Sequence, residues 1–483
     1  MKNLNLPDQN TWIGGKSEDC ELQNGPYLYD PNTSEALVRS RSSSSSQIER
    51  AIGLANETHL DGAWSELGIE GRAPMLYALA DELDAHVEEI AQLDSLNSGV
   101  PIRITRMFAS SNGDTVRAVV QRALALGNAE ALSADGRKVL IHRIPWGATA
   151  LIMPWNAPSA MAVKKLSFAL AAGATVVMKP SPASPFSTEL VAKSAAKANI
   201  PHGVVSLVLG GANVGAQLVS DRRIRAISMT GSTTTGRSIA VAAGANFARL
   251  RLELSSNNPA IVCADADVDH AAKEIASGAM KLSGQWCEAP RRVIVAQPIL
   301  QDFVAALREA LAKLRIGSSL DDDTDLGPVA FEARKLELLS QRDALKVAGA
   351  EIIEIGSPQP TGWFVQPTIA VSADIDPGME IFGPLITVQP SASDDHAIKI
   401  ANSGHVGLAA YMFSSDIEKA HILGAKLQVG EVKINGTSVL DMSPISAQSF
   451  FGESGIGGHG DEDVFDFYSG KRIVGTDMKN LPI

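Results

Sequence analysis

The stretch from Gly147 to Pro180, GATALIMPWNAPSAMAVKKLSFALAAGATVVMKP, decides the fold of this chain. Its apolar runs ATALIMP and ATVVMKP have the length of buried strands. Between them, Ala160–Ala172 predicts a helix that ends at Gly173. A strand, a helix and a second strand in this order predict a right-handed crossover between two parallel strands.

The alternation continues as far as Ser232, with further helices and strands predicted at 187–198, 204–210, 213–220 and 226–229. This series predicts a doubly wound sheet of the nucleotide-binding kind. A second alternating series, which includes the strand Val293–Val295 and the helix Ile299–Leu314, runs from Ala260 past Ala410. The 483 residues are therefore expected to form an α/β protein with at least two domains.

Two segments before Gly147 differ from this pattern. The five consecutive serines Ser42–Ser46 are expected to form a solvated loop that caps the helix after it. The turn signal Ala134-Asp135-Gly136, followed by the run Val139–Ile144, predicts a β-hairpin. An exposed hairpin leaves an open strand edge that pairing with a second copy of the chain would cover.

Composition argues against several classes of function. The net charge of −12 disfavours a surface for nucleic acid, and the longest apolar runs are too short to cross a membrane. The three cysteines, Cys20, Cys263 and Cys287, are far apart, so neither a disulfide framework nor a zinc site is indicated. The polar N-terminal residues do not resemble a signal peptide. We expect a cytoplasmic protein without a metal, which binds neither nucleic acid nor membrane.

Three short clusters carry candidate chemistry. Asn156 follows the strand ATALIMP, where its amide could donate to a developing oxyanion or cap the next helix. Glu253 lies in the run RLEL, where it could be a general base with a pKa raised by apolar surroundings, or a paired structural acid. Cys287 ends the run SGQWC and could be a thiolate nucleophile or a buried, inert cysteine.

In this order and spacing the clusters resemble the NAD(P)-dependent aldehyde dehydrogenases, and the resemblance extends over nearly the whole chain. Its motifs are Pro154–Pro158, Lys179-Pro180, Thr230-Gly231-Ser232 with Gly236, Leu252-Glu253-Leu254, Gly284-Gln285 before Cys287, Glu380–Pro384, Gly407–Ala410 and Lys433–Gly436. The resemblance implies oxidation of an aldehyde to a carboxylic acid through a cysteine thiohemiacetal and a thioester. It implies that Cys287 is the nucleophile, that Asn156 holds the oxyanion and that Glu253 activates water.

The resemblance also implies a bound NAD or NADP and a tunnel for a small aldehyde. The residues implied at the cofactor are Pro154, Trp155, Lys179, Ser181, Gly231, Ser232, Glu380 and Phe382. The residues implied at the substrate are Ala157, Ala160, Met161, Lys164, Trp286, Ile445 and Phe451. Lys164 stands where an aromatic side chain is common, so it either points into solvent or selects an anionic aldehyde.

Three further departures from the family pattern follow Leu254, follow Lys179 and lie near the C-terminus. Ser255 and Ser256 replace glycines that commonly follow the Glu-Leu pair, which would restrict the backbone beside Glu253. Pro182 replaces a glutamate that many NAD-preferring members use to hold the ribose hydroxyls, so use of NADP stays open. The C-terminal motif is altered throughout Phe451–Glu462, with an effect that the sequence does not reveal.

The resemblance implies a division into four parts. These are a cofactor domain (1–122 and 146–252), a catalytic domain (253–430), an oligomerisation element (123–145 and 465–483) and a return segment at the active site (431–464). A homodimer or homotetramer is implied. A CoA-acylating semialdehyde dehydrogenase is one alternative, which Glu253 disfavours. A non-catalytic protein that keeps the fold is another, which the joint presence of Cys287, Glu253 and Asn156 disfavours.

Overall fold

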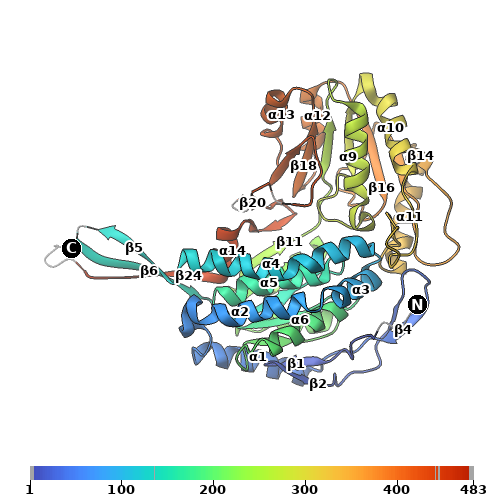
Figure 1. Cartoon of the computed structure of the whole chain (residues 1–483). Coiled ribbons are helices and arrows are strands. Elements are labelled where there is room, and N and C mark those ends of the chain that lie inside the picture. The colour runs from blue at the N-terminus through green and yellow to red at the C-terminus, as the bar shows by residue number, and fades with distance from the viewer. Residues whose placement is uncertain (1–4, 135, 441, 444–445, 478–483) are drawn as a thin grey trace.

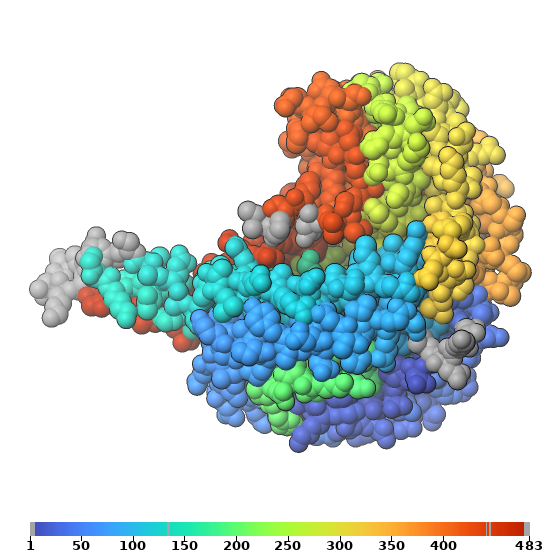
Figure 2. Space-filling model, viewed as in Figure 1, coloured from blue at the N-terminus to red at the C-terminus, as the bar shows by residue number. Residues whose placement is uncertain are grey.

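The structure, a computed structural model, describes residues 5–134, 136–440, 442–443 and 446–477. Two α/β bodies lie one above the other in Figure 1, and a narrow arm projects from the lower one. Figure 2 shows that the arm stands clear of the rest of the molecule. Each body is built around one sheet whose central strands run parallel. The predicted α/β class with two alternating series is therefore confirmed.

The lower body holds a sheet in the order β2-β1-β9-β8-β7-β10-β11-β22. Its strands are β1 (Thr11–Ile13), β2 (Lys16–Glu18), β7 (Ala148–Ile152), β8 (Val176–Lys179), β9 (Val205–Leu207), β10 (Ile224–Thr230), β11 (Arg249–Glu253) and β22 (Gly455–Ile456). The strands β7 to β11 are parallel, and β7 lies between β8 and β10. Strand order therefore reverses between β7 and β10, where a doubly wound sheet opens a crevice at the carboxyl ends of its strands.

Helices cover both faces of this sheet. Leu151 packs toward α2–α6, whereas Ala150 packs toward α1, α7 and α8, because successive residues of a strand point to opposite faces. The helices are α1 (Ser45–Leu60), α2 (Gly68–Asp84), α3 (Val87–Ser98), α4 (Ile102–Leu126), α5 (Pro158–Ala171), α6 (Phe186–Lys197), α7 (Ala212–Ser220) and α8 (Thr233–Gly244). The elements predicted between Gly147 and Ser232 are all present. Among the described residues, no helix is long and apolar enough to cross a membrane.

The upper body repeats this layered plan around a sheet in the order β14-β15-β16-β13-β12-β18-β19. Its strands are β12 (Pro259–Val262), β13 (Arg292–Ala296), β14 (Glu351–Glu354), β15 (Thr368–Val371), β16 (Leu385–Ser391), β18 (Ala409–Phe413) and β19 (Glu431–Ile434). Val293 faces α9 (Val268–Met280) and α10 (Leu300–Ala312), and Ile294 faces α12 (Asp394–Ala401) and α13 (Ile417–Gly424). The edge strand β14 is antiparallel and packs near α11 (Glu332–Val347).

The arm is a three-stranded antiparallel sheet in the order β24-β6-β5, seen at the left of Figure 1. Its strands are β5 (Ala129–Ala134), β6 (Arg137–Pro145) and β24 (Ser469–Gly475), and α14 (Asp461–Tyr468) leads into the last of them. Phe465 of α14 packs edge-on against Phe168 of α5 at 4.9 Å, which ties the base of the arm to the lower body. The predicted hairpin is confirmed, and Asp135 in its turn lies outside the described residues.

The C-terminal segment before α14 joins the two bodies. Within it, β22 pairs with β11 of the lower sheet, and β21 (Phe451–Gly452) pairs with β17 (Val406–Gly407) beside the upper sheet. Two more short strands, β20 (Gln448–Ser449) and β23 (Gly458–His459), pair with each other. The altered motif Phe451–Glu462 therefore lies where the two bodies meet.

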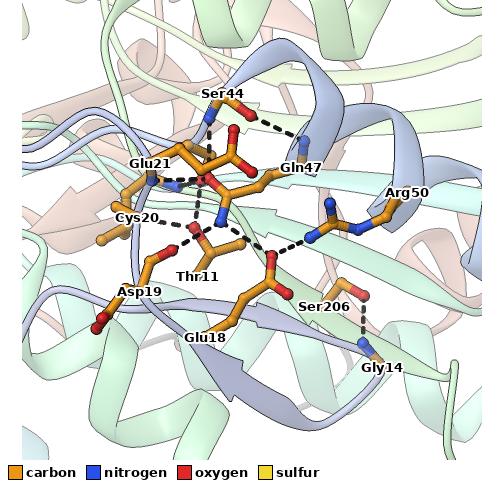
Figure 3. A network of polar contacts seen from close by, with 12 residues as sticks. Thr11, Gly14, Glu18, Asp19, Cys20, Glu21, Ser44, Gln47, Arg50 and Ser206 are labelled. Atoms are coloured by element: carbon orange, nitrogen blue, oxygen red, sulfur yellow. Dashed lines mark hydrogen bonds and ion pairs between the residues drawn. The ribbon is translucent and has the colours of Figure 1, made fainter.

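The serine run caps helix α1, as predicted, but it is not a solvated loop: Ser43 is buried, and Ser45 and Ser46 already belong to the helix. Ser44 is the N-cap: its hydroxyl accepts the Gln47 N–H at 3.1 Å, and the Gln47 side-chain oxygen accepts the Ser44 N–H at 3.0 Å. Gln47 also donates to Glu18 of β2 and to the Asp19 carbonyl (Figure 3). This capping box satisfies backbone donors at the helix N-terminus and connects α1 to the edge of the lower sheet.

Replacing Ser44 by alanine is expected to destabilise the lower body by about 1 kcal/mol, because the cap loses its acceptor. The midpoint of thermal unfolding should fall by a few degrees. Ser46→Ala is the matched control, since Ser46 is exposed and lies outside the capping box. Equal midpoints for the two variants would show that the capping box contributes nothing measurable.

Candidate active site

A pocket opens at the carboxyl ends of β7 and β10, where the strand order reverses. Asn156 follows β7, Ser232 follows β10 and Glu253 ends β11, while Cys287 reaches the same pocket from the upper body. The pocket is lined by Pro154, Trp155, Asn156, Thr230, Gly231, Ser232, Glu253, Leu254, Ser255, Cys287, Arg334, Glu380 and Phe382. It brings together the residues predicted for catalysis and all those predicted for the cofactor except Lys179 and Ser181.

The loop that carries Cys287 is held by backbone contacts on several sides. Gly284 has a φ of +75°, and a Cβ there would come within 2.4 Å of the Gly383 backbone, so only glycine fits. Arg291 donates to the Gly284 carbonyl at 3.2 Å. Asn258 donates to the Cys287 carbonyl at 2.8 Å and to the Ala289 carbonyl at 3.1 Å. Sequence reasoning missed Asn258, because an asparagine before a proline gives no signal of this long-range contact.

The side chains of Cys287, Glu253 and Asn156 line the same pocket. The Cys287 Sγ lies 3.4 Å from Glu253 Oε1, and the other carboxylate oxygen accepts the Thr230 hydroxyl at 3.2 Å. The Asn156 amide donates to the Gln285 carbonyl at 2.7 Å. That bond uses one of the two amide hydrogens and fixes the amide beside the cysteine loop.

The electrostatics of Glu253 differ from the sequence-based expectation. Burial by itself raises the pKa of this carboxyl group, but the charge of His459, which forms only at low pH, and the charges of Lys165 and Arg251 outweigh it and lower the pKa to about 2. The raised pKa expected from apolar surroundings is therefore wrong. Alternate residues of a strand share a face, so β11 presents Arg251 on the same side as Glu253. The carboxylate is ionised throughout the neutral pH range.

The pKa of the Cys287 thiol shifts in the opposite direction. Burial, followed by the negative charge of Glu253, raises its pKa well above the ordinary value of a cysteine. Before any substrate binds, the site at neutral pH therefore holds a neutral thiol beside a carboxylate that can accept its proton.

Lys165 is a second buried group that sequence reasoning missed. Its ammonium group donates to the Ser228 hydroxyl at 3.0 Å, and burial lowers its pKa to about 7. It follows Lys164 directly, and nothing in the sequence distinguishes the two lysines. In α5, however, Lys165 is buried whereas Lys164 is half-buried.

The predicted cofactor residues take distinct positions around the pocket. Ser232 is the N-cap of α8, and its hydroxyl accepts the Thr235 N–H at 3.3 Å. Glu380 Oε1 accepts the Ser256 N–H at 3.2 Å, and the Phe382 ring packs edge-on against Trp155 at 5.4 Å. These contacts place a helix N-terminus, a carboxylate and an aromatic ring on one cavity.

Lys179 and Ser181 do not line this cavity, and lie at and just after the end of β8, the strand next to β7. Lys179 is buried, its ammonium group donates to the Pro180 carbonyl at 3.2 Å, and burial lowers its pKa to about 8. The Ser181 hydroxyl accepts the Ala183 N–H at 3.2 Å in the following turn. Within the described part of the chain, no group of three or more His, Cys, Asp and Glu side chains could hold a metal ion.

The two serines after Leu254 have specific contacts. The Ser255 hydroxyl accepts the Thr233 N–H at 3.2 Å in the first turn of α8. The Ser256 hydroxyl donates to Asn258 at 2.6 Å, and Asn258 in turn holds the Cys287 loop. Neither serine has a positive φ, so both fit this backbone without the freedom of glycine.

Four residues predicted at the substrate lie along the start of α5: Ala157 is its N-cap, and the other three share one face of the helix. Ala157, Ala160, Met161 and Lys164 are all half-buried. The spacing i, i+3, i+4, i+7 places them in one stripe. By contrast, Ser159, Ala162 and Val163 between them are buried. The stripe follows directly from Asn156, so it extends away from the catalytic pocket along the helix.

The remaining predicted substrate residues lie around the C-terminal segment and the cysteine loop. Trp286 is buried beneath the Lys281 ammonium group, 5.3 Å from the ring centre. Phe451 is 43% exposed in β21, whereas its neighbour Phe450 is buried and packs edge-on against the His459 ring at 5.0 Å. Ile445 lies outside the described residues. The substrate roles of these residues stay predictions.

The doubly wound sheet with a pocket at its switch point defines a dinucleotide-binding class of α/β protein. Within this class the chain belongs to the aldehyde dehydrogenase family, whose model matches residues 22–474.

Relatives of the chain match over nearly their whole lengths. The betaine aldehyde dehydrogenase of Bacillus subtilis is 31% identical over 93% of this chain and 93% of its own length. The mitochondrial succinate-semialdehyde dehydrogenase of Arabidopsis thaliana is 32% identical over 94% of this chain and 87% of its own length. A solved NAD+ complex of an aldehyde dehydrogenase from Bacillus cereus has a TM-score of 0.92 at 28% identity, and covers 98% of this chain and 97% of that one.

The pKa of Cys287 predicts how the thiol reacts before substrate binds. Iodoacetamide should alkylate it slowly at pH 7 and faster as the pH rises through 9, because only the thiolate reacts. Glu253→Gln removes a negative charge 3.4 Å from the sulfur, so it should lower the thiol pKa and speed alkylation at pH 7. Cys287→Ala is the control for labelling elsewhere. Unchanged or slower alkylation of Glu253→Gln would contradict this electrostatic account.

Proposed function

We propose that this protein oxidises an aldehyde to a carboxylic acid with NAD or NADP, with Cys287 as nucleophile, Asn156 as oxyanion donor and Glu253 as base. The observation that carries the proposal is the 3.4 Å contact between the Cys287 sulfur and a Glu253 oxygen, in a pocket that also presents Asn156 and Ser232. A nucleophile, a base and an oxyanion donor around one point are the parts that acyl chemistry at a thiol requires.

The first step is attack of the Cys287 sulfur on the aldehyde carbon. The thiol proton passes to Glu253, whose ionised Oε1 is already in contact with the sulfur. The carbonyl oxygen becomes an oxyanion, which the second hydrogen of the Asn156 amide can stabilise. Because the Gln285 carbonyl holds the first hydrogen, the amide needs no rearrangement during the reaction.

The groups around the pocket support a dinucleotide cofactor. The N-terminus of α8 opens onto it at Ser232, which suits a pyrophosphate, and Glu380 offers carboxylate oxygens to ribose hydroxyls. A nicotinamide held there would accept a hydride from the thiohemiacetal carbon and leave a thioester on Cys287. The Bacillus cereus relative was solved with NAD+, which supports this assignment. Pro182 is exposed and carries no charge to repel a 2′-phosphate, which supports use of NADP as well.

Glu253 releases the thiol proton to solvent before the last step, in which it accepts a proton from water while the hydroxyl oxygen bonds to the thioester carbon. The carbon–sulfur bond breaks, and the cysteine thiolate regains a proton as the acid leaves. A carboxylate with a pKa of about 2 is a weak base. The contribution of Glu253 to catalysis therefore depends on its position next to the sulfur. Contacts on both of its carboxylate oxygens define that position.

We assign the half-buried stripe of α5 to the substrate. Ala157 and Ala160 are small and leave room next to Asn156, and Lys164 lies one further turn along. The charge of Lys164 reaches the active site, since it lowers the pKa of His459. These features favour a small aldehyde that carries an acidic group. By its name, the succinate-semialdehyde dehydrogenase among the relatives acts on an aldehyde that carries an acidic group.

The exposed arm supports assembly into a homodimer or homotetramer. Its last strand, β24, exposes Ile473 and Val474, at 68% and 52% of their surfaces. Exposed apolar side chains on an open sheet edge favour pairing with a second copy of the chain. All three cysteines are free, and a reactive thiol at Cys287 suits a reducing compartment such as the cytoplasm.

The proposed activity is tested with a panel of aldehydes and either NAD or NADP, following absorbance of the reduced cofactor. Wild-type protein should oxidise at least one aldehyde without CoA, and NADP should support the reaction to within about a thousandfold of NAD. Cys287→Ala should lose turnover by more than about a hundredfold while it still binds cofactor. Turnover only when CoA is added would show the acylating alternative, and turnover by Cys287→Ala would rule out covalent catalysis at this cysteine.

The substrate assignment predicts a preference of roughly 10- to 150-fold in kcat/KM for an aldehyde with a carboxylate over an aliphatic one of equal length. Lys164→Met should erase that preference and spare oxidation of neutral aldehydes, because only the charge-assisted contact is lost. Lys193→Met is the control, since Lys193 is an exposed lysine on α6. A wild-type preference for neutral aldehydes, or no effect of Lys164→Met, would place Lys164 outside the substrate site.

A further inference from the structure

The altered C-terminal motif brings a histidine to the candidate base. His459 is the last residue of β23, in the segment that joins the two bodies. Its Nε2 lies 3.8 Å from Glu253 Oε2, on the side of the carboxylate opposite the Cys287 contact. The imidazole side chain is only 13% exposed and the carboxylate side chain 4% exposed, so water has little access to the space between them.

The hydrogen-bond partners of His459 define which of its nitrogens carries the proton. Arg251 Nη2 lies 3.0 Å from His459 Nδ1. A guanidinium group has only donors, so Nδ1 must be the unprotonated acceptor and Nε2 must carry the hydrogen. The Nε2–H therefore faces the Glu253 carboxylate. Burial, as the largest cause, lowers the pKa of His459 to about 3, so this ring is neutral at physiological pH.

Arg251 in turn is fixed on several sides. It is buried, and its Nε donates to the Gly458 carbonyl at 2.8 Å, next to the histidine itself. Its guanidinium carbon lies 5.8 Å from the centre of the Phe450 ring, and that ring packs edge-on against His459 at 5.0 Å. The imidazole is thus held by an arginine on one nitrogen and an aromatic ring on its side.

We propose that His459 is a positioning residue for Glu253, which holds Oε2 through its Nε2–H so that Oε1 stays directed at the Cys287 sulfur. The proposal rests on the proposed function, in which Glu253 is the base. The distance of 3.8 Å exceeds a hydrogen bond, and a shift of less than about 1 Å would close it. Such contacts commonly shorten when a substrate fills the site.

The other charged groups around Glu253 and His459 do not take over the histidine's role as a donor to Oε2. Glu253 also faces Lys165, Arg251 and the Cys287 thiol. The Lys165 ammonium donates to Ser228, and Arg251 donates to His459 and to the Gly458 carbonyl. Besides the Thr230 hydroxyl, His459 is therefore the neutral donor that the structure places next to Oε2.

The test compares His459→Phe with His459→Gln. Phenylalanine keeps the planar ring but has no donor, whereas the glutamine amide nitrogen can donate from nearly the position of Nε2. His459→Phe should lower kcat by roughly 10- to 100-fold, as misplacement of a catalytic group by about 1 Å does, with little change in KM. His459→Gln should recover most of the activity.

A double variant shows whether the histidine acts through Glu253. In a Glu253→Gln background, His459→Phe should cause almost no further loss, because the group that it positions is already absent. Three results would overturn the proposal: wild-type turnover of His459→Phe, equal damage by the phenylalanine and glutamine variants, or fully additive losses in the double variant. Wild-type turnover of Glu253→Gln alone would instead overturn the assignment of the base, and this proposal with it.

Discussion

The parallel order of five strands in the lower sheet is the constraint on which the site depends. Because β7 lies between β8 and β10, the loops after β7 and β10 leave the sheet in opposite directions and open a crevice between them. Asn156 and Ser232 sit on those two loops, and Glu253 ends the next strand. Three side chains that are distant in sequence therefore converge without any special local conformation at their own positions.

The proposed nucleophile, Cys287, comes from the other body, so the site also depends on contacts between the two bodies. The Asn156 amide donates to the carbonyl of Gln285, two residues before the cysteine, and thereby connects the end of β7 to the cysteine loop. The C-terminal segment adds a second connection, since β22 extends the lower sheet and β21 pairs beside the upper one. A relative displacement of the bodies would separate Cys287 from Glu253 and misalign the reacting groups.

Where the two bodies meet, burial and neighbouring charges govern the pKa values of the site residues. A carboxylate as buried as Glu253 would ordinarily take up a proton, but Arg251 and Lys165 keep it ionised. The same burial makes His459 neutral and keeps the Cys287 thiol protonated. The site therefore holds an ionised carboxylate in contact with a neutral thiol and next to a neutral donor, so the geometry rather than the pKa values supports proton transfer to Glu253.

The sequence by itself determined the alternating strands and helices from Gly147 to Ser232, the hairpin, a helix cap within the run Ser42–Ser46 and the motifs that surround Asn156, Glu253 and Cys287. These are local signals, since periodicity, turn residues and short motifs lie within a few residues of one another. Only the tertiary structure showed that Lys165 and His459 surround Glu253 and that Asn258 holds the cysteine loop. Those contacts join residues far apart in the chain, and the pKa of a buried group depends on charges that only folding brings near it.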